Sequence, residues 1–558
     1  MSAQPTSELA ADGRPAGGRV SVARQVVEAL RDIGVRHVFG VPSGGWVDYM
    51  EAMRTTEGIE FVLTTHEGTG AIMADVCGRL TGAPGACFGT FGPGATNLST
   101  GVGGALLDRS PLIALTDEMP APMRGRVTQM GIDHQALFAP LTKMTTRLQP
   151  GSVREILFDA ARVALSGRPG SVHVGLPVGM SAEMTVPAEG LPAPVAARAA
   201  KAPPPDIEAL RAALRSARRP VLALGLGAVR TGVGEAVARF AGAHDIPVVL
   251  TPMAKGMIGE DHRCYAGVLF HALSDEVGKT HQQADLVVLV GYDPVEFNVE
   301  AWAPAVKLIN IDEEPADIDR SAYPDVVEIR GDIASSVEAM CATSMEPKDW
   351  DMEALKERRE AMFARLRGGD AFGPCAALDI LREVLPDDGI MTCDVGAHTH
   401  LIGQKWPTPA PGRQIMTNGW STMGFGIPAA IAAKLCRPQA AVCAVVGDGG
   451  FLMSAGELAT AVRLDLPVVT VVLTDNDLAL IRIKQQKKQN PIYGTPIRSG
   501  GAIGGDNFFG VPVLSANDRA GFRAALQRAF AAGRPMIVEA AISSLEYDEL
   551  VLKKDKPH

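Results

Sequence analysis

Two aspartates near the C-terminal end of the chain each follow an apolar segment, in a pattern that suits a metal–diphosphate site. Asp448 lies within Gly447-Asp448-Gly449, after the apolar stretch 441–446, and Asp475 follows the apolar stretch 468–473. Parallel strands joined by a helix, here about 454–464, bring their carboxyl ends together, so both aspartates should meet in one crevice. Glycines let backbone approach a phosphate, and carboxylate and carbonyl oxygens suit Mg²⁺. An ordinary βαβ turn with acidic loop ends is the alternative for this triplet alone.

The composition is that of a globular protein with several domains. The 558 residues are 46 % apolar and 21 % charged, with 53 Lys and Arg against 63 Asp and Glu, a net charge of −10. The one small basic cluster, Lys484 to Lys488, indicates a solvated helix face, so we expect no nucleic-acid partner. No apolar run approaches 18 residues, so we expect no membrane span. Eight cysteines without CxxC or zinc spacing, and a polar start without a signal peptide, indicate the cytoplasm.

Apolar strands alternate with helical segments in three blocks of the chain. This alternation is typical of parallel sheets covered on both faces, so we expect an α/β protein with three doubly wound parallel-sheet domains. The expected strands are 37–41, 61–65, 86–90 and 112–116, then 221–225, 247–250, 286–291 and 308–311, then 390–393, 441–446, 468–473 and 536–541. The expected organisation is a disordered tail 1–18, a first domain 19–187, a linker 188–206, a central domain 207–348, a helical connector 349–371 and a third domain 372–558.

Several motifs in order along nearly the whole chain resemble the acetolactate synthases and their relatives, which use thiamine diphosphate (ThDP). The diphosphate motif of these enzymes is GDG followed some 25 to 30 residues later by Asn or Asp. The other matching segments are 66–82 and 92–97 in the first block, 290–297 and 311–318 in the second, and 422–430 in the third. The second-block segments are similar to the catabolic, flavin-free branch, and 97–101 and 107–111 also resemble carboxyethylarginine synthase. The resemblance implies a pyrimidine-binding, a central Rossmann-like and a diphosphate-binding domain.

The resemblance implies which residues act on the cofactor. Glu67 is the carboxylate that shifts the aminopyrimidine of ThDP to its imino tautomer, and Met423 is the apolar wedge that bends the cofactor. The alternatives are a solvated Glu at a helix start and a Met that fills the core. Asp448 and Asp475 are the side-chain ligands of Mg²⁺, and the backbone carbonyl of Asp477 is a third. The other cofactor-binding residues implied are His398, Ser421, Gly447, Gly449 and Gly450, whereas His400 is interpreted as structural.

The family resemblance also bears on assembly and on flavin. A ThDP site of this kind needs Glu67 from one subunit and the diphosphate domain of another. We therefore expect active sites between subunits, in a homodimer or homotetramer. Flavin-dependent relatives carry an Arg-containing motif where this chain has Tyr292-Asp293-Pro294, so we expect no FAD.

Several expected pocket positions depart from the pyruvate-condensing relatives. Gly45 stands where the relatives have Ala or Lys, which should leave more room and remove a charge. Met130 aligns with a pocket Gln, and Gln129 lies one position away. Lys484 replaces a Gln or Trp that helps to select the second substrate, so an inward ammonium would favour an anionic acceptor. The alternative is that Lys484 faces water. Two further residues, Leu480 and Ile481, are expected to face the pocket.

The leading interpretation is a ThDP- and Mg²⁺-dependent carboligase. It would decarboxylate a 2-oxo acid such as pyruvate and transfer the resulting enamine to a second carbonyl acceptor. The same cofactor could instead support simple decarboxylation, hydroxyacyl lyase action or transfer to an amine acceptor. A non-catalytic paralogue is disfavoured because Glu67, Asp448 and Asp475 are present. A nicotinamide or flavin oxidoreductase would rest only on the Rossmann-like middle block, and the stretch 222–230 lacks a full GxGxxG.

Overall fold

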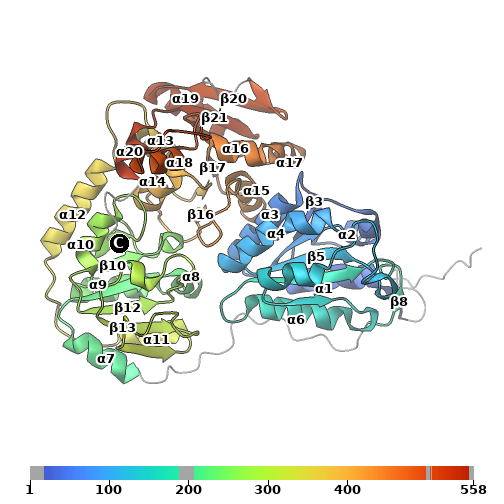
Figure 1. The fold of residues 1–558 in the computed structure, drawn as a ribbon, viewed down its shortest axis with the longest axis horizontal. Helices are drawn as coiled ribbons and strands as arrows, with labels where there is room; N and C mark the ends of the chain where they lie inside the picture. The colour runs from blue at the N-terminus through green and yellow to red at the C-terminus, as the bar shows by residue number, and fades with distance from the viewer. Residues whose placement is uncertain (1–17, 188–206, 498–502, 504, 552–558) are drawn as a thin grey trace, which may run out of the picture. The chain divides into compact units, whose positions relative to one another are not determined.

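The computed structural model describes residues 18–187, 207–497, 503 and 505–551 (Figure 1). The chain divides into two compact units, residues 1–199 and 200–558. The predicted linker 188–206 and nearly all of the predicted tail 1–18 lie outside the described residues. Within the described part of the chain, no helix is long and apolar enough to cross a membrane.

The first unit is built on a six-stranded, all-parallel sheet. Its strand order is β3-β2-β4-β5-β7-β6, so the connection after β2 runs to β3 on one side and the connection after β4 runs to β5 on the other side. The strands are β2 (His37–Gly40), β3 (Glu60–Leu63), β4 (Gly85–Gly89), β5 (Leu112–Glu118), β6 (Thr145–Arg147) and β7 (Ser171–Pro177). A short antiparallel pair, β1 (Val20–Ser21) and β8 (Met184–Thr185), lies beside it. The helices are α1 (Val22–Ile33), α2 (Val47–Arg54), α3 (Glu67–Thr81), α4 (Pro93–Leu107), α5 (His134–Phe138) and α6 (Val153–Leu165).

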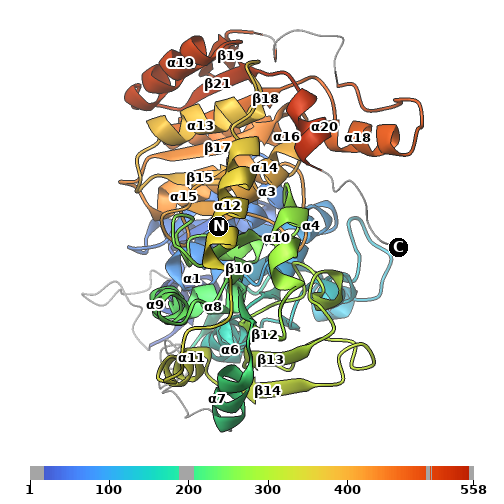
Figure 2. The same ribbon diagram turned by 90° about the vertical axis from the view of Figure 1, so that its left-hand side faces the viewer.

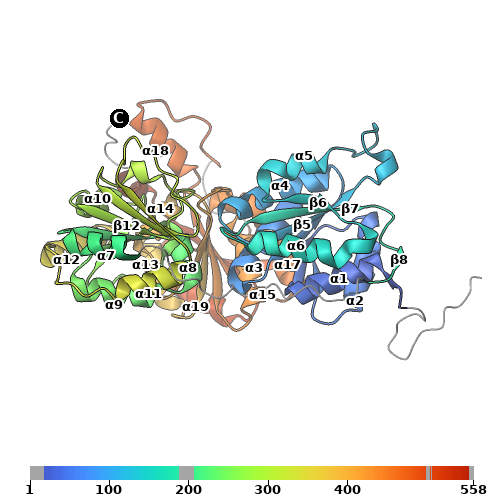
Figure 3. The ribbon, with the colours of Figure 1, turned by 90° about the horizontal axis from the view of Figure 1, so that it is seen from below.

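Helices cover both faces of this sheet. One hydrophobic core joins α1, α2 and α6 to alternate residues of the strands. The other strand residues face α3 and α4, because successive strand side chains point to opposite faces. Figures 1 and 3 show α1 and α6 on one side of the strands, and Figure 1 shows α3 and α4 on the other. The first unit is therefore doubly wound, as the sequence predicts.

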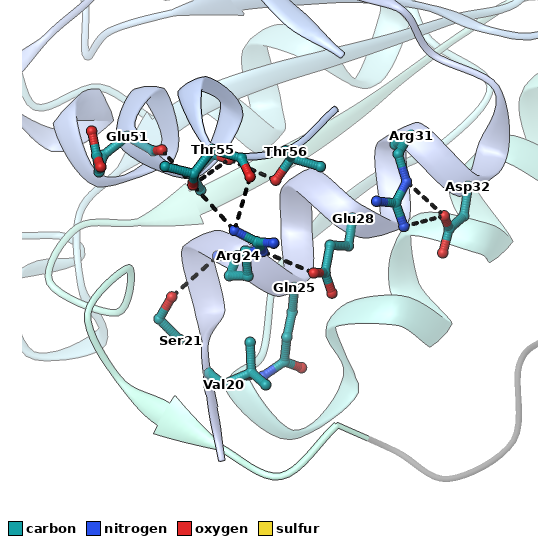
Figure 4. A network of polar contacts seen from close by, with 11 residues as sticks. Val20, Ser21, Arg24, Gln25, Glu28, Arg31, Asp32, Glu51, Thr55 and Thr56 are labelled. Carbon is teal, nitrogen blue, oxygen red and sulfur yellow. Dashed lines mark hydrogen bonds and ion pairs between the residues drawn. The ribbon is translucent and has the colours of Figure 1, made fainter. Parts of the chain in front are cut away.

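Specific residues of the sequence determine both ends of helix α1. The Ser21 hydroxyl accepts a hydrogen bond from the Arg24 backbone N–H at 3.2 Å, which caps the N-terminus. Gly34 ends the helix with φ +111°, a conformation that glycine adopts without strain. On the exposed face, Arg24 binds Glu28 at 2.8 Å and the Thr55 hydroxyl at 3.1 Å, which ties α1 to the end of α2 (Figure 4).

The second unit contains two sheets. The first is all parallel, in the order β11-β10-β9-β12-β13-β14. Its strands are β9 (Pro220–Leu224), β10 (Val248–Leu250), β11 (Tyr265–Val268), β12 (Leu286–Val290), β13 (Lys307–Asp312) and β14 (Val326–Arg330). Its helices are α7 (Ile207–Ser216), α8 (Leu226–Thr231), α9 (Gly234–His244), α10 (Ser274–His281) and α11 (Ile333–Cys341), and α12 (Met352–Arg365) is the connector that the sequence predicts.

The other sheet has the order β16-β15-β17-β18-β21-β20-β19 and is parallel except for β19. Its strands are β15 (Ile390–Cys393), β16 (Gln414–Met416), β17 (Val442–Gly447), β18 (Val468–Thr474), β19 (Asn507–Phe508), β20 (Val511–Ala516) and β21 (Met536–Ala541). Its helices are α13 (Pro374–Val384), α14 (Ala397–Lys405), α15 (Gly426–Cys436), α16 (Asp448–Ser454), α17 (Leu458–Arg463), α18 (Ala479–Lys487), α19 (Arg519–Ala531) and α20 (Leu545–Leu550). Figure 2 shows α13 and α15 on the two sides of β15 and β17.

One predicted element differs in the structure. The sequence predicts a helix from about 454 to 464, whereas α16 begins at Asp448, and a short 3₁₀ turn at Ala455–Glu457 separates it from α17. The early start lies in a Gly-Gly pair, which has low helix propensity, so local preference alone would not predict it. The consequence is that Asp448 stands at the first turn of a helix.

Candidate functional site

Glu67 stands at the carboxyl edge of the first sheet. It is the first residue of α3, follows β3 after a short turn, and is 8 % exposed. The side-chain amide of Asn97 on α4 donates a hydrogen bond to Glu67 Oε2 at 2.9 Å. Ligands of open parallel sheets bind at this edge, where the strand order reverses, here between β2 and β4. Glu67 is therefore a buried carboxylate at the edge where this fold binds ligands.

The turn after β4 approaches Glu67 closely. Gly92 has φ +49°, and a Cβ on Gly94 would lie 3.3 Å from Glu67 Oε1. The Gly92 N–H donates to His134 Nε2 at 3.2 Å. Because that nitrogen accepts, a neutral His134 carries its proton on Nδ1, which lies 3.0 Å from the Thr116 hydroxyl. The turn beside Glu67 is thus held by a defined hydrogen-bond chain.

This chain continues through a buried cluster of Glu118, His134 and His173, whose ligand atoms lie within 4.8 Å of one another. The Thr116 hydroxyl lies 2.8 Å from His173 Nε2, and Thr145 lies 2.7 Å from His173 Nδ1. All four ring nitrogens therefore have hydrogen-bond partners. Burial lowers the pKa of His134 to about 4 and that of His173 well below its ordinary value, so both rings are neutral at pH 7. The cluster supports the turn and is explained without a metal ion.

The second site lies in the other unit, at the carboxyl ends of β17 and β18. Asp448 is 2 % exposed and accepts the backbone N–H of Asn476 at 2.7 Å. Asp475 Oδ1 accepts the Asp477 N–H at 3.3 Å, but the buried Oδ2 has no hydrogen-bond partner among the described residues. Burial, together with the charge of Asp448, raises the pKa of Asp475 to about 7. A buried and a half-buried carboxylate, the latter with a buried unpartnered oxygen, fit a bound divalent cation.

The loop that follows β18 and begins with Asp475 contains two features that the sequence did not indicate. Asn476 has φ +60°, a conformation that Asn tolerates, and its buried side-chain oxygen has no hydrogen-bond partner in the described part of the chain. The Asp477 side chain forms an ion pair with Arg482 at 3.1 Å, and Arg482 also pairs with Asp548 on α20 at 3.0 Å. The ion pair with Arg482 holds the side chain of Asp477. The role of the Asp477 backbone carbonyl as a Mg²⁺ ligand stays a prediction.

The glycine turn after β17 is closely surrounded. A Cβ on Gly449 would lie 3.2 Å from Met423 Cε, and one on Gly447 would lie 3.5 Å from His398 Cε1. His398 is 3 % exposed, and its buried Nε2 has no hydrogen-bond partner within the residues that the structure describes. Burial lowers its pKa to about 4, so the ring is neutral. The structure therefore brings together Met423, His398 and the Gly447–Gly450 turn.

Asp394 is a residue of this edge that the sequence analysis missed. It follows β15, is fully buried, and accepts backbone N–H groups of Val395 at 2.6 Å and of Gly424 and Gly426 at 3.0 Å. A Cβ on Gly450 would lie 2.9 Å from its carboxyl carbon. Burial raises the pKa of Asp394 to about 6. Asp394 thus fixes the backbone on both sides of Phe425, next to the glycine turn.

The remaining predicted positions are less enclosed. Ser421 is exposed, has φ +55°, and donates to the Asn418 carbonyl at 2.9 Å. Leu480 packs partly against the core, Ile481 is 45 % exposed, and Lys484 is exposed. The exposure of Lys484 agrees with the alternative that it faces water, although its charge contributes to the lowered pKa of His400, after burial.

Three predicted pocket positions lie in the first unit, and the expectation for one of them, Gly45, is corrected by the structure. Gln129 and Met130 are exposed, and Met130 has φ +57°. The sequence predicts that Gly45 leaves room and removes a charge. In the structure, a Cβ at Gly45 would lie 2.8 Å from Asp117 Oδ1. A carboxylate therefore already fills the space that we expected to be open.

Comparisons with known proteins agree with this geometry. Residues 20–137, 207–340 and 394–540 match the N-terminal TPP binding, central and C-terminal TPP binding domains of the thiamine pyrophosphate enzymes. The chain is 32 % identical to the acetolactate synthase of Bacillus subtilis over 479 residues, 84 % of each chain. It is 31 % identical to the catabolic acetolactate synthase of Raoultella terrigena over 484 residues, 84 % of this chain and 85 % of that one. The chain therefore belongs to the thiamine pyrophosphate enzyme family and is an acetolactate synthase-like enzyme.

Proposed function

We propose that this enzyme is a Mg²⁺-dependent carboligase, which decarboxylates a small 2-oxo acid such as pyruvate and joins the remaining fragment to a second carbonyl compound. The observation that carries the proposal is the pair of buried Asp448 and half-buried Asp475, with the buried Asp475 Oδ2 unpartnered among the described residues. Asp448 and Asp475 would hold Mg²⁺ through their side chains, and Asp477 through its backbone carbonyl. Relatives named acetolactate synthase, which match this chain over most of its length, support the same reaction.

The chain's own residues have distinct tasks in this proposal. Backbone N–H groups at the start of α16 would bind the diphosphate of ThDP, because a helix N-terminus favours anions. The negative charge of the diphosphate would favour the protonated ring of His398, which would then donate from Nε2 to the diphosphate while its other nitrogen donates to the Asp394 carbonyl. Ser421 and Gly447 would contact the cofactor. Met423 would press against its ring system. When bound, ThDP supplies an electron sink for the cleavage of a bond next to a carbonyl.

Glu67 would exchange a proton with the aminopyrimidine of ThDP through one carboxylate oxygen. The Asn97 amide holds Oε2, which leaves Oε1 at the turn that carries Gly94. Because Glu67 is 8 % exposed, its contact with bulk solvent is limited, which favours proton exchange with the cofactor. Substrate is expected to contact Gly45, Gln129, Met130, Leu480, Ile481 and Lys484, which remain candidate pocket residues.

We further infer a homodimer or homotetramer in the cytoplasm, without FAD. The support for the oligomer is the family requirement that Glu67 and the diphosphate domain come from different subunits. The support for a reducing compartment is that the eight cysteines are free in the structure. Light scattering on the purified protein measures the oligomer, and an absorption spectrum without a flavin band checks the last point.

The proposed function is tested with pyruvate, ThDP and Mg²⁺, by following CO₂ release and identifying the products by mass. Acetolactate among the products supports carboligation with pyruvate as both donor and acceptor. CO₂ release with only an aldehyde product would make the enzyme a decarboxylase. Absence of CO₂ release from pyruvate, 2-oxobutyrate and hydroxypyruvate would refute the proposed function.

A further inference from the structure

A second buried carboxylate, Asp117, lies at the ligand-binding edge of the first unit. It is the penultimate residue of β5 and is 1 % exposed. The Ser43 hydroxyl donates to Asp117 Oδ2 at 2.5 Å, and the Thr90 hydroxyl donates to the same oxygen at 3.2 Å. These residues follow β2 and β4, the strands between which the sheet order reverses. Asp117 therefore lies on the strand next to β4, and its hydrogen bonds reach both strands that border the point where ligands bind in doubly wound folds.

The turn after β4, which contains Thr90 and Gly94, connects Asp117 to Glu67. Thr90, which donates to Asp117, places its methyl carbon 2.9 Å from the position that a Cβ would take on Gly94. That position is 3.3 Å from Glu67 Oε1. Asp117 and Glu67 therefore flank one turn, at the same edge of the same sheet, and both belong to the first unit.

The second oxygen of Asp117 faces Gly45. A Cβ there would lie 2.8 Å from Oδ1 and 3.1 Å from the carboxyl carbon, so a side chain at position 45 would displace the carboxylate. Among the described residues, both hydroxyl donors to Asp117 reach Oδ2, and none reaches Oδ1. Oδ1 is not one of the fully buried unpartnered atoms, so it reaches accessible space beside Gly45. An acceptor oxygen without a protein donor in such a space is available to a donor group of a ligand.

The charge of Asp117 is not neutralised by a basic side chain in contact, as far as the structure describes the chain. Burial raises the pKa of Asp117, and its charge contributes, after burial, to the raised pKa of the neighbouring Tyr49 hydroxyl. A ligand group that donates a hydrogen bond would relieve the cost of this buried carboxylate, whereas a ligand carboxylate would increase it through like-charge repulsion.

We propose that Asp117 selects the carbonyl acceptor: its Oδ1 accepts a hydrogen bond from a hydroxyl or ammonium group of the acceptor and disfavours a carboxylate at that position. This inference rests on the proposed carboligase function and deepens it by naming the acceptor class. Asp117 and Gly45 act as one unit, because the glycine leaves the volume that the carboxylate occupies.

The experiment is a competition between two acceptors with two carbons each. The enzyme, loaded with ThDP and Mg²⁺, receives whichever of pyruvate, 2-oxobutyrate and hydroxypyruvate releases CO₂ fastest. Glycolaldehyde, which carries a hydroxyl, and glyoxylate, which carries a carboxylate, are added at equal concentrations, and the two products are quantified by mass. The variants are Asp117→Asn, Gly45→Ala, and the control Asp159→Asn, an exposed carboxylate on α6 of the same unit. A thermal melt checks that each variant is folded.

The wild-type enzyme and Asp159→Asn should favour the glycolaldehyde product. Asp117→Asn should lower the ratio of the glycolaldehyde to the glyoxylate product by about tenfold or more, the usual scale for loss of a charged hydrogen bond. Gly45→Ala should shift the ratio in the same direction, and it tests the proposal even if Asp117→Asn does not fold. Three outcomes with CO₂ release overturn the role of Asp117 alone: an unchanged product ratio in the folded variants, a wild-type preference for glyoxylate, or formation of neither product. Absence of CO₂ from all three donors refutes the proposed function, and this inference with it.

Discussion

Replacement of Asp475 by asparagine should have opposite effects on stability and on metal binding. In the metal-free fold, burial and the neighbouring Asp448 raise the pKa of Asp475 from its ordinary value of 3.8 to about 7. A displacement of this size corresponds to ~4 kcal/mol of destabilisation once the carboxylate is charged, at about 1.4 kcal/mol per pH unit. An asparagine side chain has nearly the same shape but does not carry this charge. The metal-free variant should therefore be more stable than the wild type at pH 8.

The size of this destabilisation depends on pH. Below about pH 4 the Asp475 carboxyl is protonated in both the folded and the unfolded chain, so it makes no difference to stability. The destabilisation builds between pH 4 and pH 7, as the unfolded chain loses a proton that the fold retains, and it is complete above pH 7. The advantage of Asp475→Asn should thus be largest at pH 8 and less than half as large at pH 5.

Metal binding should change in the other direction. Loss of a residue that merely supports a metal ligand typically weakens binding about 10- to 100-fold, so loss of a direct ligand should weaken Mg²⁺ binding by at least this much. Urea unfolding in EDTA at pH 5 and pH 8 measures stability, and calorimetric titration with Mg²⁺ and ThDP measures binding. The control is Asp387→Asn, whose side chain is fully exposed in the same unit. A metal-free variant less stable than the wild type at pH 8, or one with unchanged Mg²⁺ affinity, would refute the assignment of Asp475.

Three further substitutions test other parts of the structure. Glu67→Gln should keep the hydrogen bond from Asn97 and ThDP binding while lowering turnover about 10²- to 10⁴-fold; unchanged turnover in the pyruvate assay would exclude the proton-exchange role. Arg79→Met leaves two buried acidic side chains without their cation and should destabilise the first unit by about 3–5 kcal/mol in urea unfolding, whereas a loss below ~1 kcal/mol would contradict this. Gly450→Ala should weaken ThDP binding about tenfold by pressing on Asp394, and an unchanged titration would show that the turn can yield.

The strands were predictable because buried parallel strands read as continuous apolar runs. The predicted strands 390–393 and 536–541 agree with β15 and β21 at both ends, and the predicted positions of β17 and β18 differ from the structure by one residue. The convergence of Asp448 and Asp475 was predictable because neighbouring parallel strands have their carboxyl ends at the same edge of a sheet, and β17 and β18 are neighbours. Short strands such as β16 and β6 lack an apolar run long enough to be recognised.

The missed site residues depend on contacts between distant parts of the chain. Asp117 receives its hydrogen bond from a serine 74 residues away, and Asp394 binds backbone groups 30 and 32 residues away. Neither pattern is periodic or local, so the sequence contains no signal at the spacing of a helix or strand. An aspartate within two residues of the end of a predicted strand was the one available sign, and Asp448 and Asp475 share it.

Three carboxylates at the ends of adjacent strands, two buried and one half-buried, would link the proposed Mg²⁺ binding to the stability of a loop beside the C-terminal sheet. Asp394, Asp448 and Asp475 follow β15, β17 and β18, and burial raises the pKa of both Asp394 and Asp475. Backbone N–H groups stabilise Asp394, but Asp475 keeps an oxygen with no hydrogen-bond partner in the described residues. A cation that binds only the folded chain stabilises it in proportion to the logarithm of its concentration. Mg²⁺ at this edge would therefore order the loop 475–477 as well as hold the diphosphate, since Asp448 also fixes the backbone of Asn476.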